Sequence, residues 1–260
     1  MASRAGIRNY KFSFNFFLTP AVQWLLIANF AVFFFEILLR TFSGITAYNW
    51  FLGHFGLVPS AVVQGLRIWQ PFTYLFLHEP STIWHILSNM FFLYMFGREL
   101  ELAWGRNRFL QYYFLTGIGA GIINVIVKIS LFWGQPSADI ATIGASGAIF
   151  GVLLACAILF PDRQVVMFPI PVKMSMRTFV IAMTVVEFIF TFGFGGDNIS
   201  HICHFGGMLV GYIYLRRGSF LYNVRNSVTD WQNKRNRRRF EVYINKHKKD
   251  PPSRPDNWVN

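Results

Sequence analysis

Ser146 is the residue with the clearest setting for chemistry. It lies between glycines in the run Ile143–Gly151, where an apolar stretch begins. A serine hydroxyl is a weak nucleophile unless an adjacent base accepts its proton. A neutral imidazole can take that proton and return it to the leaving group. His85 and His204 also stand near the starts of apolar stretches. These residue types predict a serine hydrolase with Ser146 as nucleophile and His204 as base.

A second histidine, His201, competes with His204 for the role of base because it lies three residues earlier on nearly the same helix face. Gly207 and Gly211 follow His204 at helical spacing and form a small-residue face. This spacing favours His204, because it would let its helix approach the helix of Ser146 closely.

The alternative for Ser146 is a purely structural role as a small residue at a helix contact. Gly147 and Gly151 would form the small-residue face of that contact. The two interpretations are compatible, since the same close approach would bring the serine within hydrogen-bond reach of His204.

An oxyanion formed during acyl transfer needs hydrogen-bond donors. His85 and Asn89 are four residues apart, so they share one helix face. The unpaired backbone N–H groups at the start of the Ser146 helix would add further donors. We therefore expect His85 and Asn89 to stabilise the transition state.

No acidic residue stands out as a partner for the base. Asp139 and Asp197 fall in loops, and Glu187 falls in the middle of an apolar stretch, where we expect a protonated carboxyl hydrogen-bonded to a neighbouring helix. We therefore expect a Ser–His dyad. Metal binding is an alternative for the histidines, but there is no His-Glu-x-x-His motif and no carboxylate near them in sequence. We expect no metal and no cofactor.

The elements that must position these residues are apolar and long. Hydrophobic residues make up 53% of the chain and charged residues 14%, against about 25% charged in a typical soluble domain. Six windows approach the ~20 residues that span a bilayer. They are residues 20–39, 83–97, 109–133, 143–160, 178–195 and 199–215. The second window must extend to about Leu102 to span. We predict an all-α membrane protein, a bundle of six transmembrane helices.

The charge distribution predicts the orientation. The net charge is +12, and Lys and Arg concentrate before the first window, after the last and in alternate loops. The positive-inside rule then places both termini in the cytoplasm. We predict a cytoplasmic segment 1–19, a membrane domain 20–217 with a long first outer loop, and a basic cytoplasmic tail 218–260. In this topology Ser146, His85 and His204 all begin inward-running helices, at a similar depth on the outer side.

The tail carries basic runs that are typical of two kinds of partner. Nucleic acid is one. Anionic lipid headgroups are the other, with about 1 kcal/mol for each Lys or Arg near the surface, and we favour them and expect no nucleic acid. Cys156 and Cys203 fall within predicted spans, so we expect small packing residues and no disulfide.

Four short motifs in order resemble those of the rhomboid intramembrane serine proteases, over about residues 50–215. They are His85–Asn89, Phe96–Glu101 followed by Trp104–Gly105, Gly144–Gly147, and His204–Gly207 with Gly211.

The resemblance implies that Ser146 is the nucleophile, His204 the base, and His85, Asn89 and the Ser146 N–H the oxyanion site. It implies that Glu101 holds the turn between the second and third helices. Phe150 stands where some members have a tyrosine that stacks on the catalytic histidine, and phenylalanine can still stack there but offers no hydroxyl.

The resemblance also implies an environment and partners. Segment 43–82 would be a first loop partly embedded in the outer leaflet, and the fifth helix with the cap 193–198 would gate entry. Substrates would be single-span membrane proteins, in a bacterial inner (plasma) membrane. A silent relative that binds membrane clients typically lacks the serine or the histidine. A small-solute transporter would show broken helices and repeats.

Overall fold

The computed structural model describes residues 18–132, 134–135, 139–167, 172–193 and 198–216, with Arg237 and Glu241 as isolated residues. The predicted N-terminal segment 1–19 is described only at its last two residues. The predicted tail 218–260 lies outside the described residues except for Arg237 and Glu241.

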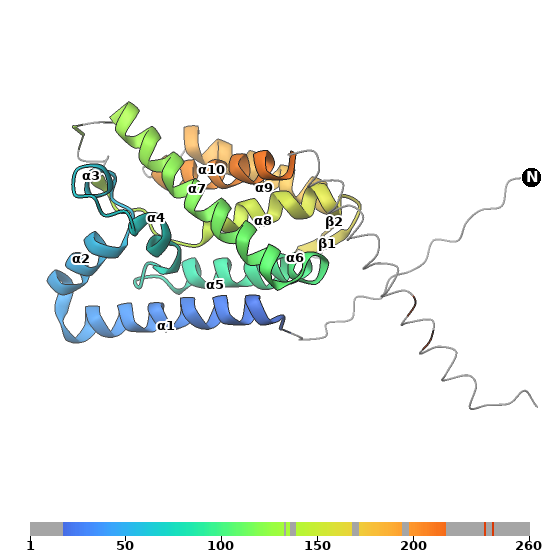
Figure 1. The fold of residues 1–260 in the computed structure, drawn as a ribbon, viewed down its shortest axis with the longest axis horizontal. Coiled ribbons are helices and arrows are strands. Elements are labelled where there is room, and N and C mark those ends of the chain that lie inside the picture. Colours follow the sequence, from blue (N-terminus) through green and yellow to red (C-terminus); the bar gives the residue numbers. More distant parts are fainter. Residues whose placement is uncertain are drawn as a thin grey trace, which may run out of the picture.

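The described chain is a bundle of helices with one small hairpin (Figure 1). Its elements are α1 (Pro20–Phe42), α2 (Gly44–Phe55), α3 (Pro59–Val63), α4 (Gln70–Thr73), the 3₁₀ helix η1 (Tyr74–Phe76), α5 (Ile83–Phe92), the π-helical section η2 (Leu93–Gly97), α6 (Arg98–Trp104), α7 (Arg106–Phe132), α8 (Ser146–Leu159), β1 (Gln164–Met167), β2 (Val172–Ser175), α9 (Met176–Gly193) and α10 (Asn198–Arg216).

Each of the six apolar windows falls largely within helix. The second is a continuous run of α5, η2 and α6, so it extends past Leu102 as a span would require. By length and composition, α1 and α7 are the two described helices that could each cross a membrane, and α8 is a shorter apolar helix. The count of six spans therefore stays a prediction.

Large apolar side chains remain exposed along the outward faces of several helices. They include Trp24, Phe34, Ile122, Ile126, Ile181, Phe188, Leu209 and Ile213. Contiguous exposed apolar surface marks contact with a partner or a membrane. The large apolar side chains exposed on α1, α7, α9 and α10 fit a bundle surrounded by lipid.

The fold is mostly helical, as predicted, but the sequence did not predict the antiparallel pair that β1 and β2 form between α8 and α9. The register runs from Gln164 opposite Ser175 to Met167 opposite Val172. β-Branched residues favour strands, and β1 carries Val165 and Val166. Strands of four residues are too short to give a clear alternating pattern in the sequence.

Glu101 has a different role from the one implied by the resemblance. Its Oε1 accepts a hydrogen bond from the N–H of Ala21 at 2.8 Å, and its Oε2 accepts one from the N–H of Val22 at 3.0 Å. A carboxylate at a helix N-terminus accepts hydrogen bonds from unpaired backbone N–H groups, and its negative charge interacts favourably with the helix dipole. The side chain therefore caps α1, while its backbone carbonyl accepts the Gly105 N–H at the α6–α7 turn.

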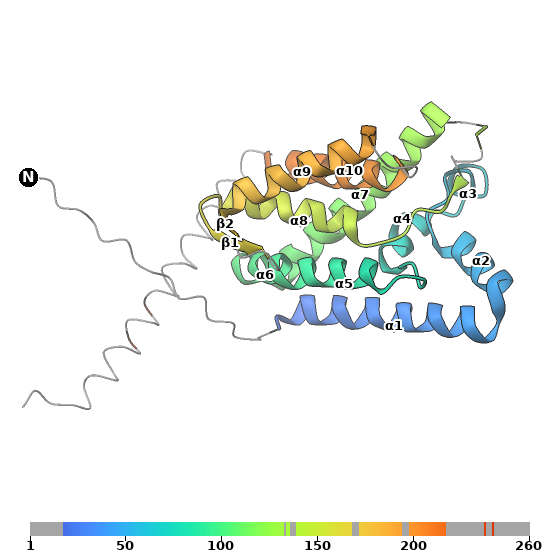
Figure 2. The ribbon, with the colours of Figure 1, turned by 180° about the vertical axis from the view of Figure 1, so that it is seen from behind.

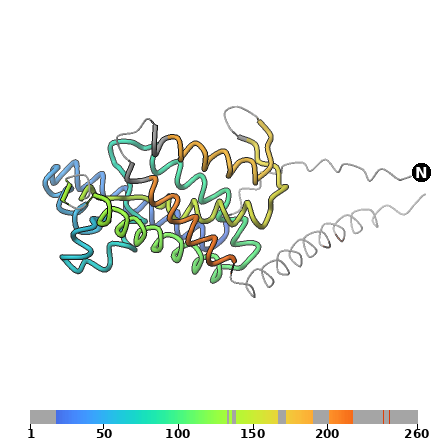
Figure 3. Tube along the Cα trace, turned by 90° about the horizontal axis from the view of Figure 1, so that it is seen from above, coloured from blue at the N-terminus to red at the C-terminus, as the bar shows by residue number. Residues whose placement is uncertain are grey.

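The helices that carry Ser146, His204 and Glu187 lie together. Seen from above, α10 lies between α7 and α9 (Figure 3). Viewed from behind, α8 and α9 run side by side from the hairpin end, while α2, α3 and α4 gather at the opposite end (Figure 2). This second end is the predicted outer side.

Candidate active site

Ser146 is the first residue of α8, and backbone pairing fixes the segment before it. Leu57 and Thr142 exchange two N–H···O bonds, each 2.9 Å. The N–H of Gly144 donates to the carbonyl of Tyr74 at 2.9 Å. Gly144 has φ +117°, a conformation that only glycine adopts without strain. The serine is therefore presented by a defined turn.

Lys128 holds the same segment through its side chain. It is buried in α7, and its Nζ donates to the carbonyl of Ile140 at 2.8 Å and to Oγ1 of Thr142 at 3.2 Å. A buried charge is costly unless it is hydrogen-bonded, so these bonds tie the segment firmly to α7. Sequence reasoning missed Lys128, although a lysine inside an apolar window is itself a signal of function.

The structure brings Ser146 and His204 together. Oγ of Ser146 lies 2.7 Å from Nε2 of His204. The ring of Phe150, one turn further along α8, stacks on the His204 ring at 4.4 Å between centroids and an interplanar angle of 13°. Phe150 thus supports the imidazole by stacking, as expected.

Close approach of α8 and α10 depends on Gly207, which lies against the backbone of Gly147. A Cβ added to Gly207 would lie 1.9 Å from the carbonyl oxygen of Gly147. Gly151 and Gly211 do not complete this contact. They lie instead against α7, where an added Cβ would come within 2.7 Å of Thr116 and 2.4 Å of Tyr112 respectively. The two predicted glycine faces are therefore shared among three helices.

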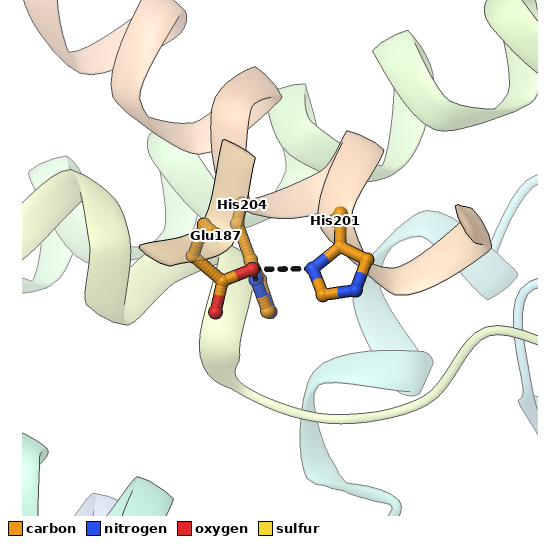
Figure 4. Close-up of side chains that lie close together, drawn as sticks. All are labelled: Glu187, His201 and His204. Carbon is orange, nitrogen blue, oxygen red and sulfur yellow. Dashed lines mark hydrogen bonds and ion pairs between the residues drawn. The ribbon is translucent and has the colours of Figure 1, made fainter. Parts of the chain in front are cut away.

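A carboxylate does lie beside the base, so the expectation that none would do so is wrong. Oε2 of Glu187 is hydrogen-bonded to Nδ1 of His204 at 2.8 Å and also to Nδ1 of His201 (Figure 4). Glu187 lies six residues before the end of α9, and His204 six residues after the start of α10. Successive antiparallel helices place such positions at the same depth. The contact with a neighbouring helix was expected, but its partners were not. One oxygen shared by two ring nitrogens fits an ionised carboxylate, rather than the protonated carboxyl expected from the sequence.

His85 approaches the serine turn from α5. A Cβ added to Gly144 would lie 2.9 Å from Nε2 of His85 and 3.9 Å from Oγ of Ser146. On its other side, Nδ1 of His85 accepts the backbone N–H of Glu79 at 3.5 Å. In this neutral tautomer Nε2 carries the proton. His85 therefore directs an N–H donor toward the serine turn.

Asn89 is buried one turn below His85, and its Nδ2 donates to the His85 carbonyl at 2.8 Å. The contact is therefore with its own helix, which leaves one amide hydrogen for another acceptor.

Cys156 and Cys203 are both free and buried, which confirms the prediction of packing residues without a disulfide.

Comparison with known proteins agrees with these observations. Residues 65–218 match the rhomboid domain family. "RHOMBOID-like protein 1" of Arabidopsis thaliana is 29% identical over 252 residues, which cover 87% of this chain and 60% of that protein. "Rhomboid protease GluP" of Bacillus subtilis is 31% identical over 159 residues, which cover 61% of this chain and 27% of that protein.

A further relative comes from a eukaryotic organelle. "Rhomboid protein 1, mitochondrial" of Saccharomyces cerevisiae is 27% identical over 135 residues, which cover 50% of this chain and 37% of that protein. The matches thus span 60% or less of the length of these three relatives.

Proposed function

This chain belongs to the rhomboid family, and from that premise we propose that it is an intramembrane serine endopeptidase that cleaves transmembrane segments. One observation carries the proposal: Oγ of Ser146 lies 2.7 Å from Nε2 of His204 at the start of α8. This is the distance at which an imidazole can take the hydroxyl proton as the oxygen attacks a carbonyl.

The reaction would proceed in two halves. Oγ of Ser146 attacks the scissile carbonyl while its proton passes to Nε2 of His204. The imidazolium then returns the proton to the leaving amine, and an acyl-enzyme remains. Water repeats the sequence and releases the second product, which restores the serine.

Glu187 changes the proposed constellation from a dyad to a triad. Its Oε2 accepts the Nδ1–H of His204, which holds the tautomer whose Nε2 is free to act as base. The same carboxylate would stabilise the imidazolium that forms during attack. Because Glu187 acts through His204, we describe it as a positioning residue.

Donors for the oxyanion come from two elements. His85 directs Nε2–H toward the serine turn from α5, and α8 contributes the N–H groups of its first turn. The N-cap Ala145 forms no side-chain cap bond to these groups, and helix N-termini favour negative charge. Asn89 could add its second amide hydrogen from one turn below.

Membership of the family makes the chain membrane-embedded, and we propose six spans with both termini on the Lys- and Arg-rich side. Substrates would be single-span membrane proteins that enter laterally from the bilayer. A bacterial plasma membrane remains the proposed location. Relatives from a plant and from yeast mitochondria mean that family membership alone selects no compartment.

The test is incubation of the purified full-length chain, reconstituted in lipid vesicles, with a panel of single-span transmembrane peptides. The wild type should cleave at least one peptide, and the Ser146→Ala variant should cleave none. A wild type that binds peptides without cutting any member of the panel would favour a silent client-binding protein and overturn the proposal.

A further inference from the structure

Three metal-ligating side chains converge on the face of the candidate site that lies away from Ser146. Glu187 of α9 and the pair His201 and His204 of α10 each offer one ligand atom, and these atoms lie within 4.8 Å of one another. Figure 4 shows the carboxylate directed at both imidazoles. Two imidazole nitrogens with one carboxylate oxygen form a ligand set typical of three-ligand zinc sites.

We propose that this cluster binds a divalent transition-metal ion of the Zn²⁺ type, and that binding inhibits the protease. The proposal of inhibition rests on the proposed function, whereas the metal site itself does not. Hard cations such as Mg²⁺ and Ca²⁺ prefer all-oxygen ligands, so the site should discriminate against them.

The inhibition follows from the chemistry of one imidazole ring. In the hydrogen-bonded state, Nδ1 of His204 carries the proton and Nε2 presents a lone pair to the serine hydroxyl. A metal bound to Nδ1 uses the lone pair of that nitrogen, so the single ring proton of neutral imidazole must move to Nε2. No proton is gained or lost. The nitrogen that faces Ser146 becomes a donor and can no longer accept the hydroxyl proton.

The surroundings of the cluster fit a reversible site. The side chains of Glu187, His201 and His204 are 17%, 19% and 12% exposed, so protein atoms do not fully enclose them. His201 lies one turn after the start of α10, on the predicted outer side. Oγ of Ser146 would accept the Nε2–H of the liganded His204, the kind of outer-shell hydrogen bond that orients a metal-bound imidazole.

The experiment uses the purified full-length chain, freed of metal with a chelator, and Co²⁺ as a spectroscopic probe for the zinc site. Titration of the wild type should give the visible absorption of four-coordinate Co²⁺, saturating near one equivalent and reversed by Zn²⁺. The Ser146→Ala variant should give the same spectrum, because the serine is not a ligand. Its result separates the metal site from the protease, since this variant cannot cleave.

The site is tested with matched pairs of variants. Loss of an outer-shell partner costs about 10–100-fold in metal affinity, so loss of a ligand should cost at least about tenfold. His201→Ala and Glu187→Gln should therefore bind Co²⁺ at least about tenfold more weakly than His54→Ala and Glu99→Gln, which remove the same group types elsewhere.

Inhibition is then measured as the ratio of cleavage with and without Zn²⁺. His54→Ala should be inhibited at the same Zn²⁺ concentration as the wild type. The activity of His201→Ala is expressed relative to its own activity without metal, and this variant should need at least about tenfold more Zn²⁺ for the same inhibition.

Equal Co²⁺ affinity in His201→Ala and His54→Ala would overturn the metal site. Co²⁺ binding at the cluster with undiminished cleavage would overturn the inhibition. Absence of cleavage under all conditions would contradict the proposed function and leave the spectroscopic test decisive for the site.

Discussion

At the scale of the residue, the proposed reaction depends on the hydrogen-bond partners of two imidazole rings, those of His204 and His85. Nε2 of His204 faces Ser146 and its Nδ1 faces Glu187, while Nδ1 of His85 accepts a backbone N–H. Each imidazole is therefore held in one tautomer by the bond on its far side. One ring becomes an acceptor and the other a donor, and the two are the groups that acyl transfer requires.

Glu187 offers the clearest prediction at this scale. Replacement by Gln leaves a group that can still accept a hydrogen bond but carries no charge to stabilise the imidazolium. Loss of the acid from a Ser–His–Asp triad costs about 10⁴ in kcat, so we expect Glu187→Gln to lower kcat by about 10²–10⁴ with little change in KM.

The matched control for Glu187→Gln is Glu99→Gln, whose carboxylate pairs with Arg163 away from the site. Glu187→Asp should recover part of the lost kcat. A general loss of folded protein would lower the melting temperature as well, so both variants are also melted. Wild-type kcat in Glu187→Gln would mean that the carboxylate has no part in the reaction.

At the scale of the element, the site exists because helices approach closely where side chains are missing. Gly207 lies against the backbone of Gly147. Gly151 and Gly211, the other two glycines of the predicted faces, pack against α7. The sequence pattern predicted a close α8–α10 contact correctly. It could not show that Gly151 and Gly211 serve a third helix, because spacing reveals a small face but not the neighbour that fills it.

Gly207→Ala tests that contact. The added Cβ would overlap the Gly147 carbonyl, so the helices must separate, and overpacking of this kind costs about 1–3 kcal/mol. Gly53→Ala is the matched control, since an added Cβ there has nothing within 4 Å. Thermal unfolding in detergent should show a lower melting temperature for Gly207→Ala and none of that loss for Gly53→Ala. Equal melting temperatures would mean that the contact is not tight.

The cap on α1 makes a separate prediction. In Glu101→Gln one oxygen of the pair becomes an NH₂ group that cannot accept from the backbone N–H of α1. Removal of an N-cap acceptor costs about 0.5–2 kcal/mol, and we expect a loss of unfolding free energy of that order. Activity well below the melting temperature should persist, because α1 carries none of the reacting groups. Unchanged stability would show that α1 does not need the carboxylate.

At the scale of the whole molecule, the sequence predicted six helical windows and the contact of Ser146 with His204, because both follow from local sequence patterns. Apolar length, glycine spacing and equal depth in a helical bundle were sufficient for that. The partner of His204 depended on how α9 and α10 pair around their connection, which no window reveals. The β1–β2 hairpin and the cap by Glu101 likewise depend on long-range contacts and short segments without clear periodicity.

The position of the site predicts where a substrate is cut. Ser146, His85 and His204 cluster toward the predicted outer side, and a substrate helix keeps its amides paired until it unwinds. Cleavage should fall near the outer face of a single-span peptide. Gly or Pro just after the cut should speed it, because they lower helix stability by about 1 and 3 kcal/mol. Mass spectrometry of the products locates the cut. A cut at the cytoplasmic end, or rates unaffected when leucine replaces those residues, would contradict this placement.

In the proposed mechanism His204 activates Ser146 as a nucleophile. The most direct measurement is covalent labelling of the full-length chain with a fluorophosphonate, followed by intact-mass and peptide mapping. We expect one adduct, on Ser146, which is formed by the wild type and by His54→Ala and is lost in His204→Ala. An adduct on another residue, or labelling of Ser146 at the wild-type rate in His204→Ala, would contradict this mechanism.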